Sequence, residues 1–340
     1  MSYSRPDETW GYEPPEAAPP AEGSAWGETY PEEPTRAEQR RAADTTGARR
    51  RVSTGAFRTA DAREDHTLPP PTPHLIHRLP AIAVAIVVSA GLVLGAQMER
   101  PVYAAGIAVL QIAAVVLVTW VRRIDGAWLT IAVASLLAVG ADWVAVTWQP
   151  VSLLPITVLL ALAFGASVAG QLVRRTHEGV TESLGFTMVL CIAVCGYACY
   201  IALSRLGSAP PAMYSAVVAA GTAILAARAV DLVMPDPRIN RQVTRGAFGI
   251  VIGTMCGTAS AAYAGLVIEG PDPKHAAIGG LLVALIAVLS DLACGYMSAS
   301  RRIDGAGTAP NPVVSAAGPL LAFAVTGPVV YLLSAYYMID

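Results

Sequence analysis

The sequence has little charge and almost no lysine. Charged residues make up 14% of the 340 residues and apolar residues 54%, so the chain is much more apolar than an average soluble domain of this size. Lys274 is the single lysine among 23 basic residues, and the sequence contains no basic nucleic-acid motif. The composition therefore excludes nucleic acid as an expected partner and makes lipid the expected solvent for most of the chain.

Cysteine is also scarce, and its placement argues against a secreted disulfide framework. The five cysteines all lie inside apolar runs, at Cys191, Cys195, Cys199, Cys256 and Cys294. The first three follow an i, i+4, i+8 pattern, which places them along one stripe of a helix. Because no histidine lies nearby in the sequence, we predict reduced cysteines that pack as small side chains. A metal or redox role for the stripe is the alternative.

Much of the charge lies in residues 1–78, a proline-rich segment without a periodic apolar pattern. Such a segment cannot bury enough apolar surface to offset its chain entropy, so we predict a disordered tail. Its start is acidic and its second half is rich in arginine, which is typical of a segment that contacts anionic lipid or docks onto a protein partner. No apolar stretch with a small-residue cleavage site opens the sequence, and the first hydrophobic helix is expected to direct insertion.

Residues 79–340 hold nine apolar runs, each near the roughly 20 residues that a helix needs to cross a hydrocarbon core. We therefore predict an all-α integral membrane protein, a bundle of about nine transmembrane helices that follows the tail. The predicted spans are 79–97, 102–121, 127–147, 152–173, 184–204, 211–233, 246–268, 275–297 and 313–336.

Arginine is unevenly distributed between successive loops. The loops after the second, fourth, sixth and eighth spans contain two or three arginines each, whereas the others offer only Arg100, Arg205 and Lys274. By the positive-inside rule the arginine-rich loops and the tail are cytoplasmic, and the C-terminus is extracytoplasmic. The excess of arginine over lysine and the alanine-rich spans indicate a high-GC bacterial genome, and hence a plasma membrane.

The seventh predicted span carries a small side chain at every fourth position. The residues concerned are Gly249, Gly253, Gly257, Ala261 and Gly265. Such a stripe lets another helix backbone approach closely, where dispersion and weak hydrogen bonds hold helices together. We expect the stripe to pack on a neighbouring span or on a second copy of the chain in a homo-oligomer.

Ionisable residues inside membrane spans are costly and therefore informative. Arg228 and Asp231 share one face near the cytoplasmic end of the sixth span, and Asp291 lies at a similar depth in the eighth. If these spans touch, the three residues form a buried charge cluster with a mouth ringed by Arg241, Arg245, Arg301 and Arg302. Such a cluster suits an anionic headgroup or a nucleotide phosphate with a divalent metal. The alternative is a structural ion pair with ordinary positive-inside anchors. Asp142, near the outer end of the third span, is expected to be interfacial.

Three segments carry a family resemblance: residues 220–222, 241–246 and 290–299. Their order resembles that of the motifs in the integral membrane phosphatidate cytidylyltransferases, which make CDP-diacylglycerol from CTP and phosphatidate. The resemblance covers roughly residues 80–340. Asp291 matches the acid of the family motif Gly-Asp-Leu-x-Glu-Ser-x-x-Lys-Arg. Arg241 keeps one basic residue of the family motif Lys-Lys-Thr-x-Glu-Gly.

The departures from the family pattern concern its acidic residues. Gly221, Cys294 and Arg245 stand where the family has Asp, Glu and Glu, and the closing His-Gly-Gly-x-x-Asp-Arg motif has no match. Joining CTP to phosphatidate requires divalent cations held by several carboxylates. The resemblance thus implies that this chain has no catalytic residue and needs no cofactor. The residues that would bind a metal are unknown, and magnesium would be needed only if some activity remains.

The sequence therefore predicts a non-catalytic relative of this family that binds phospholipid or a membrane partner. Membrane lipids are its expected partners, and residues 1–78 are a candidate arm for a protein partner. The alternatives are a transporter or channel subunit and an assembly component of a cell-envelope complex.

Overall fold

A computed structural model describes residues 75–122, 127–173, 180–207, 209–239, 243, 245–268, 272–303 and 312–337. The chain divides into two units, and all of these residues belong to the one that comprises residues 60–340. The predictions made for residues 1–74 and for Arg241 lie outside the described residues. Those made for the side chains of Arg301 and Arg302 lie outside them as well.

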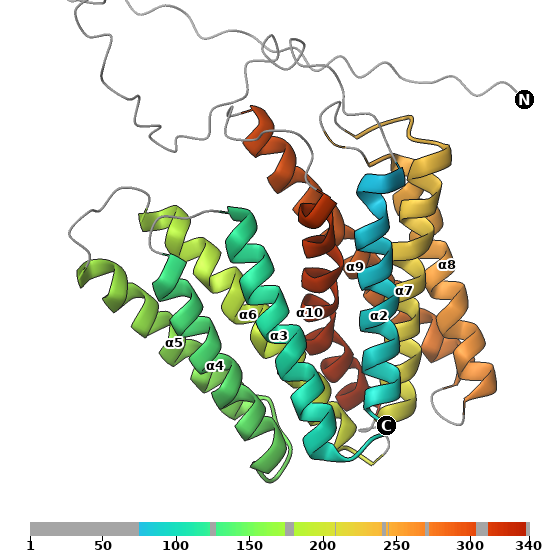
Figure 1. The fold of residues 1–340 in the computed structure, drawn as a ribbon. Helices are drawn as coiled ribbons and strands as arrows, with labels where there is room; N and C mark the ends of the chain where they lie inside the picture. The colour runs from blue at the N-terminus through green and yellow to red at the C-terminus, as the bar shows by residue number, and fades with distance from the viewer. Residues whose placement is uncertain are drawn as a thin grey trace, which may run out of the picture. The chain divides into compact units, whose positions relative to one another are not determined.

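The part of the chain that the structure describes forms nine helices and no strand (Figure 1). They are α2 (Leu75–Gly95), α3 (Arg100–Arg122), α4 (Ala127–Thr147), α5 (Leu154–Val173), α6 (Val180–Ser204), α7 (Pro210–Val233), α8 (Ala247–Val267), α9 (Pro273–Ile303) and α10 (Pro312–Tyr337). Each is long and apolar enough to cross a membrane. Helices satisfy every backbone group internally, as the hydrocarbon core demands. The predicted all-helical architecture is confirmed for these residues, and it indicates a multi-pass membrane protein.

Three helices extend four or more residues beyond their predicted spans, and α6 is one of them, since it begins at Val180 against a predicted start at residue 184. The first, α2, begins at Leu75, four residues before the predicted start, and α9 continues to Ile303, six residues beyond the predicted end. Hydropathy marks where a chain enters water, whereas a helix ends only where its backbone pairing ends. At 31 residues, α9 is about 46 Å long and exceeds a hydrocarbon core of roughly 30 Å.

Proline marks the start of three helices. Pro210, Pro273 and Pro312 are the first residues of α7, α9 and α10. At this position the missing amide hydrogen has no intrahelical acceptor in any case, and the fixed φ angle suits a helix. Local chemistry therefore sets the starts of the three helices that supply much of the site described below.

The helices fall into two neighbouring groups with α10 between them (Figure 1). On one side α4 packs against α3, α5 and α6, and on the other α7, α8 and α9 pack against one another. Both α10 and α2 contact members of both groups, and α10 has extensive contacts with α9, α2 and α6. The small side chains of α8 face this second group. A Cβ on Gly253 would overlap Ala227 of α7, and one on Gly257 would overlap Ala284 of α9.

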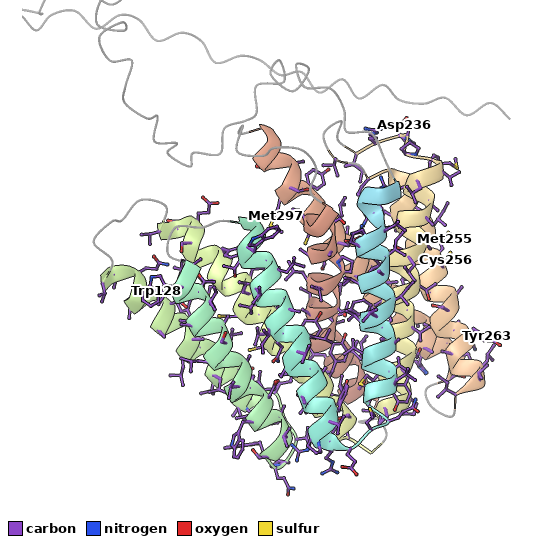
Figure 2. The ribbon with its side chains drawn as sticks, viewed as in Figure 1. Trp128, Asp236, Met255, Cys256, Tyr263 and Met297 are labelled. Carbon is purple, nitrogen blue, oxygen red and sulfur yellow. The ribbon has the colours of Figure 1, made fainter. Side chains whose placement is uncertain are left out.

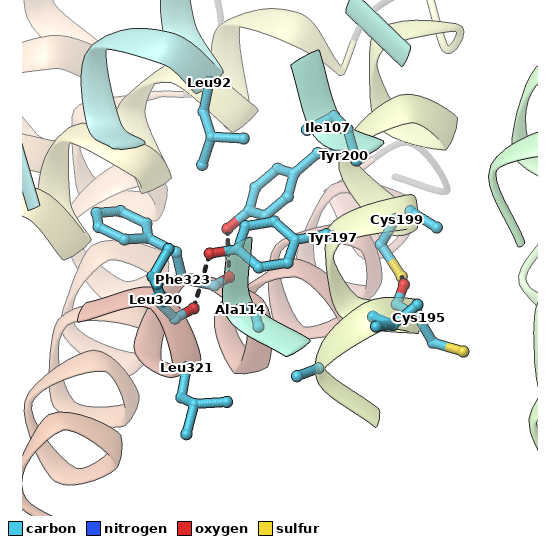
Figure 3. Close-up of a cluster of buried hydrophobic side chains, with 14 of the residues drawn as sticks. Leu92, Ile107, Ala114, Cys195, Tyr197, Cys199, Tyr200, Leu320, Leu321 and Phe323 are labelled. Atoms are coloured by element: carbon cyan, nitrogen blue, oxygen red, sulfur yellow. Dashed lines mark hydrogen bonds between the residues drawn. The ribbon is translucent and has the colours of Figure 1, made fainter. Parts of the chain in front are cut away.

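The most buried helix is α6, which packs around α10 through two tyrosines (Figure 3). The Tyr197 hydroxyl donates to the Leu320 carbonyl oxygen at 2.8 Å. The Tyr200 hydroxyl lies 3.1 Å from the Phe323 carbonyl oxygen and 2.9 Å from the Thr326 hydroxyl. Both rings are fully buried, so these bonds satisfy groups that would otherwise carry a desolvation penalty.

Glycines allow α6 and α10 to meet backbone to backbone. A Cβ on Gly196 would overlap the carbonyl oxygen of Ala324, and a Cβ on Gly327 would overlap the carbonyl oxygen of Gly196. Pro328 lacks the amide hydrogen that would normally bond to the Ala324 carbonyl. The crossing therefore forms where α10 lacks one backbone hydrogen bond and neither helix has a side chain to hold the other away.

Candidate functional site

Five buried charged residues from four parts of the chain meet near the end of α7 and the start of α8, beside the middle part of α9. Arg228 and Asp231 come from α7, Asp291 from α9, Arg78 from α2, and Arg245 from the segment just before α8. Each is less than a tenth exposed. The structure thus brings together the three residues predicted to form a charge cluster. We call these five residues the arginine–aspartate cluster.

Arg228 and Asp291 form a two-pronged ion pair between α7 and α9. The Nε of Arg228 donates to Oδ2 of Asp291 at 3.0 Å, and Nη2 donates to Oδ1. Two parallel bonds from a planar guanidinium fix geometry and are stronger than neutral hydrogen bonds. Nη2 also donates to the Ser315 carbonyl of α10 at 3.2 Å. That carbonyl lies four residues before Pro319, which has no amide hydrogen to offer it, so Arg228 supplies the missing donor.

Asp231 accepts two hydrogen bonds at the start of α8. Nη1 of Arg245 donates to Oδ2 at 2.9 Å, and the backbone N–H of Gly246, the N-cap residue of α8, donates to Oδ1 at 2.9 Å. A carboxylate at a helix N-terminus is favoured by the helix dipole. Nη2 of Arg245 forms an ion pair with Asp291, so Arg245 bridges the two acids. The sequence placed Arg245 at the mouth of the cluster, whereas the structure buries it inside.

Two glycines make room for the two carboxylates. A Cβ on Gly249 of α8 would overlap Oδ1 of Asp231, and a Cβ on Gly318 of α10 would overlap Oδ1 of Asp291. Gly249 is the first member of the small-residue stripe, and Gly265, its last, is half-buried. The stripe therefore serves the polar site at one end and helix packing along the rest of its length.

Sequence reasoning missed Arg78 because it assigned this residue to the end of the tail. Its Nη1 donates to the Arg228 carbonyl at 3.4 Å, and it lies within electrostatic range of Asp231, Arg228 and Arg238. The signal was available, since an arginine directly before an apolar run is in reach of the membrane edge. With Arg78 included, three guanidinium groups face two carboxylates, and the cluster carries a net charge of +1.

The loop after α7 adds a further arginine at the edge of the cluster. Arg238 forms an isolated β-bridge with Gly246 and an ion pair with Asp236 at 3.5 Å. The Asp236 side chain is 81% exposed (Figure 2), whereas that of Arg238 is 17% exposed. An ion pair in which one partner is this exposed contributes little to stability. Arg238 is therefore both near the buried charges and accessible from outside.

Arg245 keeps its charge despite its burial. Desolvation lowers the pKa of Arg245 to about 9, a shift to which Arg228 adds and which Asp231 opposes. This value remains well above neutral pH, so the guanidinium is protonated under physiological conditions. Arg245 therefore counts as one of the three positive charges of the cluster at neutral pH.

The arrangement suits an anion and leaves the two acids poorly placed to hold a metal. Asp231 and Asp291 are both engaged by guanidinium groups, and the described residues contain no group of three or more His, Cys, Asp or Glu side chains that could bind a metal ion. The three cysteines of the predicted stripe do not form such a group either. Cys191, Cys195 and Cys199 are buried in α6 without a disulfide.

Comparison with known proteins supplies no relative for this chain. No family model, no curated protein and no solved structure matches it. The case for a function therefore depends on the geometry of the site.

Proposed function

We propose that the protein is a non-catalytic membrane protein that binds the headgroup of an anionic phospholipid beside the arginine–aspartate cluster, at the edge formed by Arg238. The net positive charge of the cluster is the observation that carries the proposal. Arginine binds phosphate oxygens through paired N–H groups, and Arg238 offers such a group from a partly accessible position. Exposed apolar side chains on the neighbouring α8, such as Met255 (Figure 2), would flank the acyl chains.

This proposal includes the orientation predicted from the loops. The site lies at the end of the bundle where α7 ends and α8 begins, which the positive-inside rule assigns to the cytoplasm. Phosphate-rich lipid surfaces of the cytoplasmic leaflet attract basic residues there. The plasma membrane and a cytoplasmic tail are part of the same proposal. The likeness to the phosphatidate cytidylyltransferases supports it only through Asp291, which in this chain pairs with arginine.

Anionic phospholipid is expected to stabilise the purified protein in detergent. Phosphatidate or phosphatidylglycerol in large excess over its dissociation constant should raise the Tm by about 5 °C, whereas phosphatidylcholine should not. Arg238→Gln should remove most of this rise. Thermal unfolding followed by tryptophan fluorescence measures the effect. CTP with magnesium, tested in the same assay, should give no shift.

Arg100→Gln is the matched control, since Arg100 is exposed at the start of α3 and lies apart from the cluster. Its lipid-dependent rise should equal that of the unchanged protein. An equal rise with phosphatidylcholine, or an Arg238→Gln variant that keeps the full response, would contradict the proposal. Formation of CDP-diacylglycerol from CTP and phosphatidate would contradict its non-catalytic part.

A further inference from the structure

Asp142 differs from Asp231 and Asp291 because no described cationic side chain pairs with it. Its Oδ1 accepts a hydrogen bond from Nε2 of Gln111 at 2.8 Å, and no ion pair among the described residues involves it. Asp142 lies five residues before the end of α4, about 8 Å along the helix axis. The sequence predicted an interfacial residue, but the carboxyl group points inward to α3 and is half-buried.

Gln111 links this carboxyl group to a third helix. It is fully buried in α3, and its Nε2 also donates to the Val194 carbonyl of α6 at 3.1 Å. Its Oε1 has no hydrogen-bond partner. The amide nitrogen thus serves two acceptors while the amide oxygen, equally buried, has no donor. Unpaired buried acceptors are uncommon and carry a desolvation penalty.

The groups that surround Asp142 leave its negative charge uncompensated. From α6, Cys195 lies within electrostatic range of Asp142, and a thiol supplies no positive charge. Arg205, which follows α6, donates to the Ala145 and Trp148 carbonyls at 2.8 and 2.9 Å and is committed to the end of α4. The remaining neighbour of α4, α5, contains no charged residue.

A proton on Asp142 would satisfy these groups better than a negative charge does. A protonated carboxyl can pair with the amide through both of its oxygens, with Oδ2–H donating to Oε1 of Gln111 while Oδ1 keeps its bond from Nε2. Nε2 then also keeps its second bond, to the Val194 carbonyl of α6. Protonation also removes a charge from a low-dielectric region without a counter-ion.

We infer that Asp142, together with Gln111, is a proton-binding site within the membrane, built between α3, α4 and α6. The ligand is a single proton, which the carboxylate binds from solution and releases without any other covalent bond changing. The inference does not depend on lipid binding at the arginine–aspartate cluster, because the two sites share no residue and lie in different helix groups.

An apolar carbodiimide tests this inference, because it adds covalently to protonated carboxyl groups in apolar surroundings. Full-length protein in detergent is treated with dicyclohexylcarbodiimide between pH 6 and pH 9, and the adduct is located by peptide mass spectrometry. We expect an adduct on Asp142 that decreases as the pH rises and that is absent in Asp142→Asn. The ion-paired Asp231 and Asp291 are internal controls and should stay unmodified.

The role of Gln111 supplies a second readout. Gln111 can bond both forms of the carboxyl group, but hydrogen bonds to a charged carboxylate are the stronger ones, so Gln111→Leu should move the midpoint of labelling upward by about one pH unit. Absence of the Asp142 adduct from the unchanged protein at pH 6 would overturn the inference, as would labelling that does not vary with pH. Protection by sodium ions at constant pH would also overturn it, because the ligand would then be a metal cation. The main readout uses the unchanged protein, so the test does not depend on whether a variant folds.

Discussion

Asp291→Leu is expected to lower the free energy of unfolding by about 3–5 kcal/mol, because it leaves Arg228 buried without its carboxylate partner. The loss is large since Arg228 is held between α7, α9 and α10 and cannot reach water without moving a helix. Unfolding of the purified protein by SDS in mixed micelles, followed by circular dichroism, measures the change.

The double variant Arg228→Met with Asp291→Leu separates the charge effect from a packing effect. An apolar pair of similar volume replaces a buried ion pair at little cost or with a gain, and Arg245 keeps Asp231 as a partner. We expect the double variant to recover at least half of the stability that Asp291→Leu loses. If it is less stable than Asp291→Leu alone, the ion pair is not the source of the loss. The Ser315 carbonyl loses its donor in the double variant, which limits the recovery.

Gly196→Ala is expected to destabilise the protein by about 3 kcal/mol, although it adds a single methyl group. The new Cβ would overlap the Ala324 carbonyl oxygen, and two helix backbones must separate to admit it. The separation would also lengthen the hydrogen bonds of Tyr197 and Tyr200 to α10. SDS unfolding gives the stability change, and near-ultraviolet circular dichroism reports the tyrosine environment.

Gly185→Ala is the matched control on the same helix, because a Cβ at Gly185 meets no atom within 4 Å. Alanine has the better helix propensity, so this variant should be neutral or more stable by up to about 1 kcal/mol. Equal destabilisation by the two changes would show that α6 is sensitive to alanine in general and not at its crossing with α10.

The sequence predicts the helices well and the inter-helix contacts only in part. Nine apolar runs correspond to the nine helices of the described residues because the hydrocarbon core sets their length. The shared face of Arg228 and Asp231 follows from helical spacing, and their depth matched that of Asp291. That Arg245 is inside the cluster could not be deduced, because a side chain at a span end points toward water or protein with equal ease. The place of Arg78 directly before an apolar run indicates that it reaches the membrane edge, but not which residues it meets there.

The helix crossings were the least predictable feature. Gly196 and Gly327 do not belong to a four-residue repeat of small side chains, whereas the α8 stripe can be recognised by such a repeat. A single glycine permits a close helix contact only if a backbone carbonyl packs against it, and hydropathy does not show which residue lies opposite. The same holds for Gln111, whose partners Asp142 and Val194 come from two other helices.

The crossing of α6 and α10 also limits how the two helix groups can move. Rocking-bundle transporters expose a central site alternately to each side by rotating one group of helices against another. Here the groups are joined where two backbones touch and two tyrosine hydroxyls bond across the contact. Any sliding of α6 over α10 would break those bonds in a medium that offers no replacement donors. The crossing can act as a pivot but not as a sliding surface, so a transport cycle in this fold would require the two groups to tilt about Gly196 and Gly327.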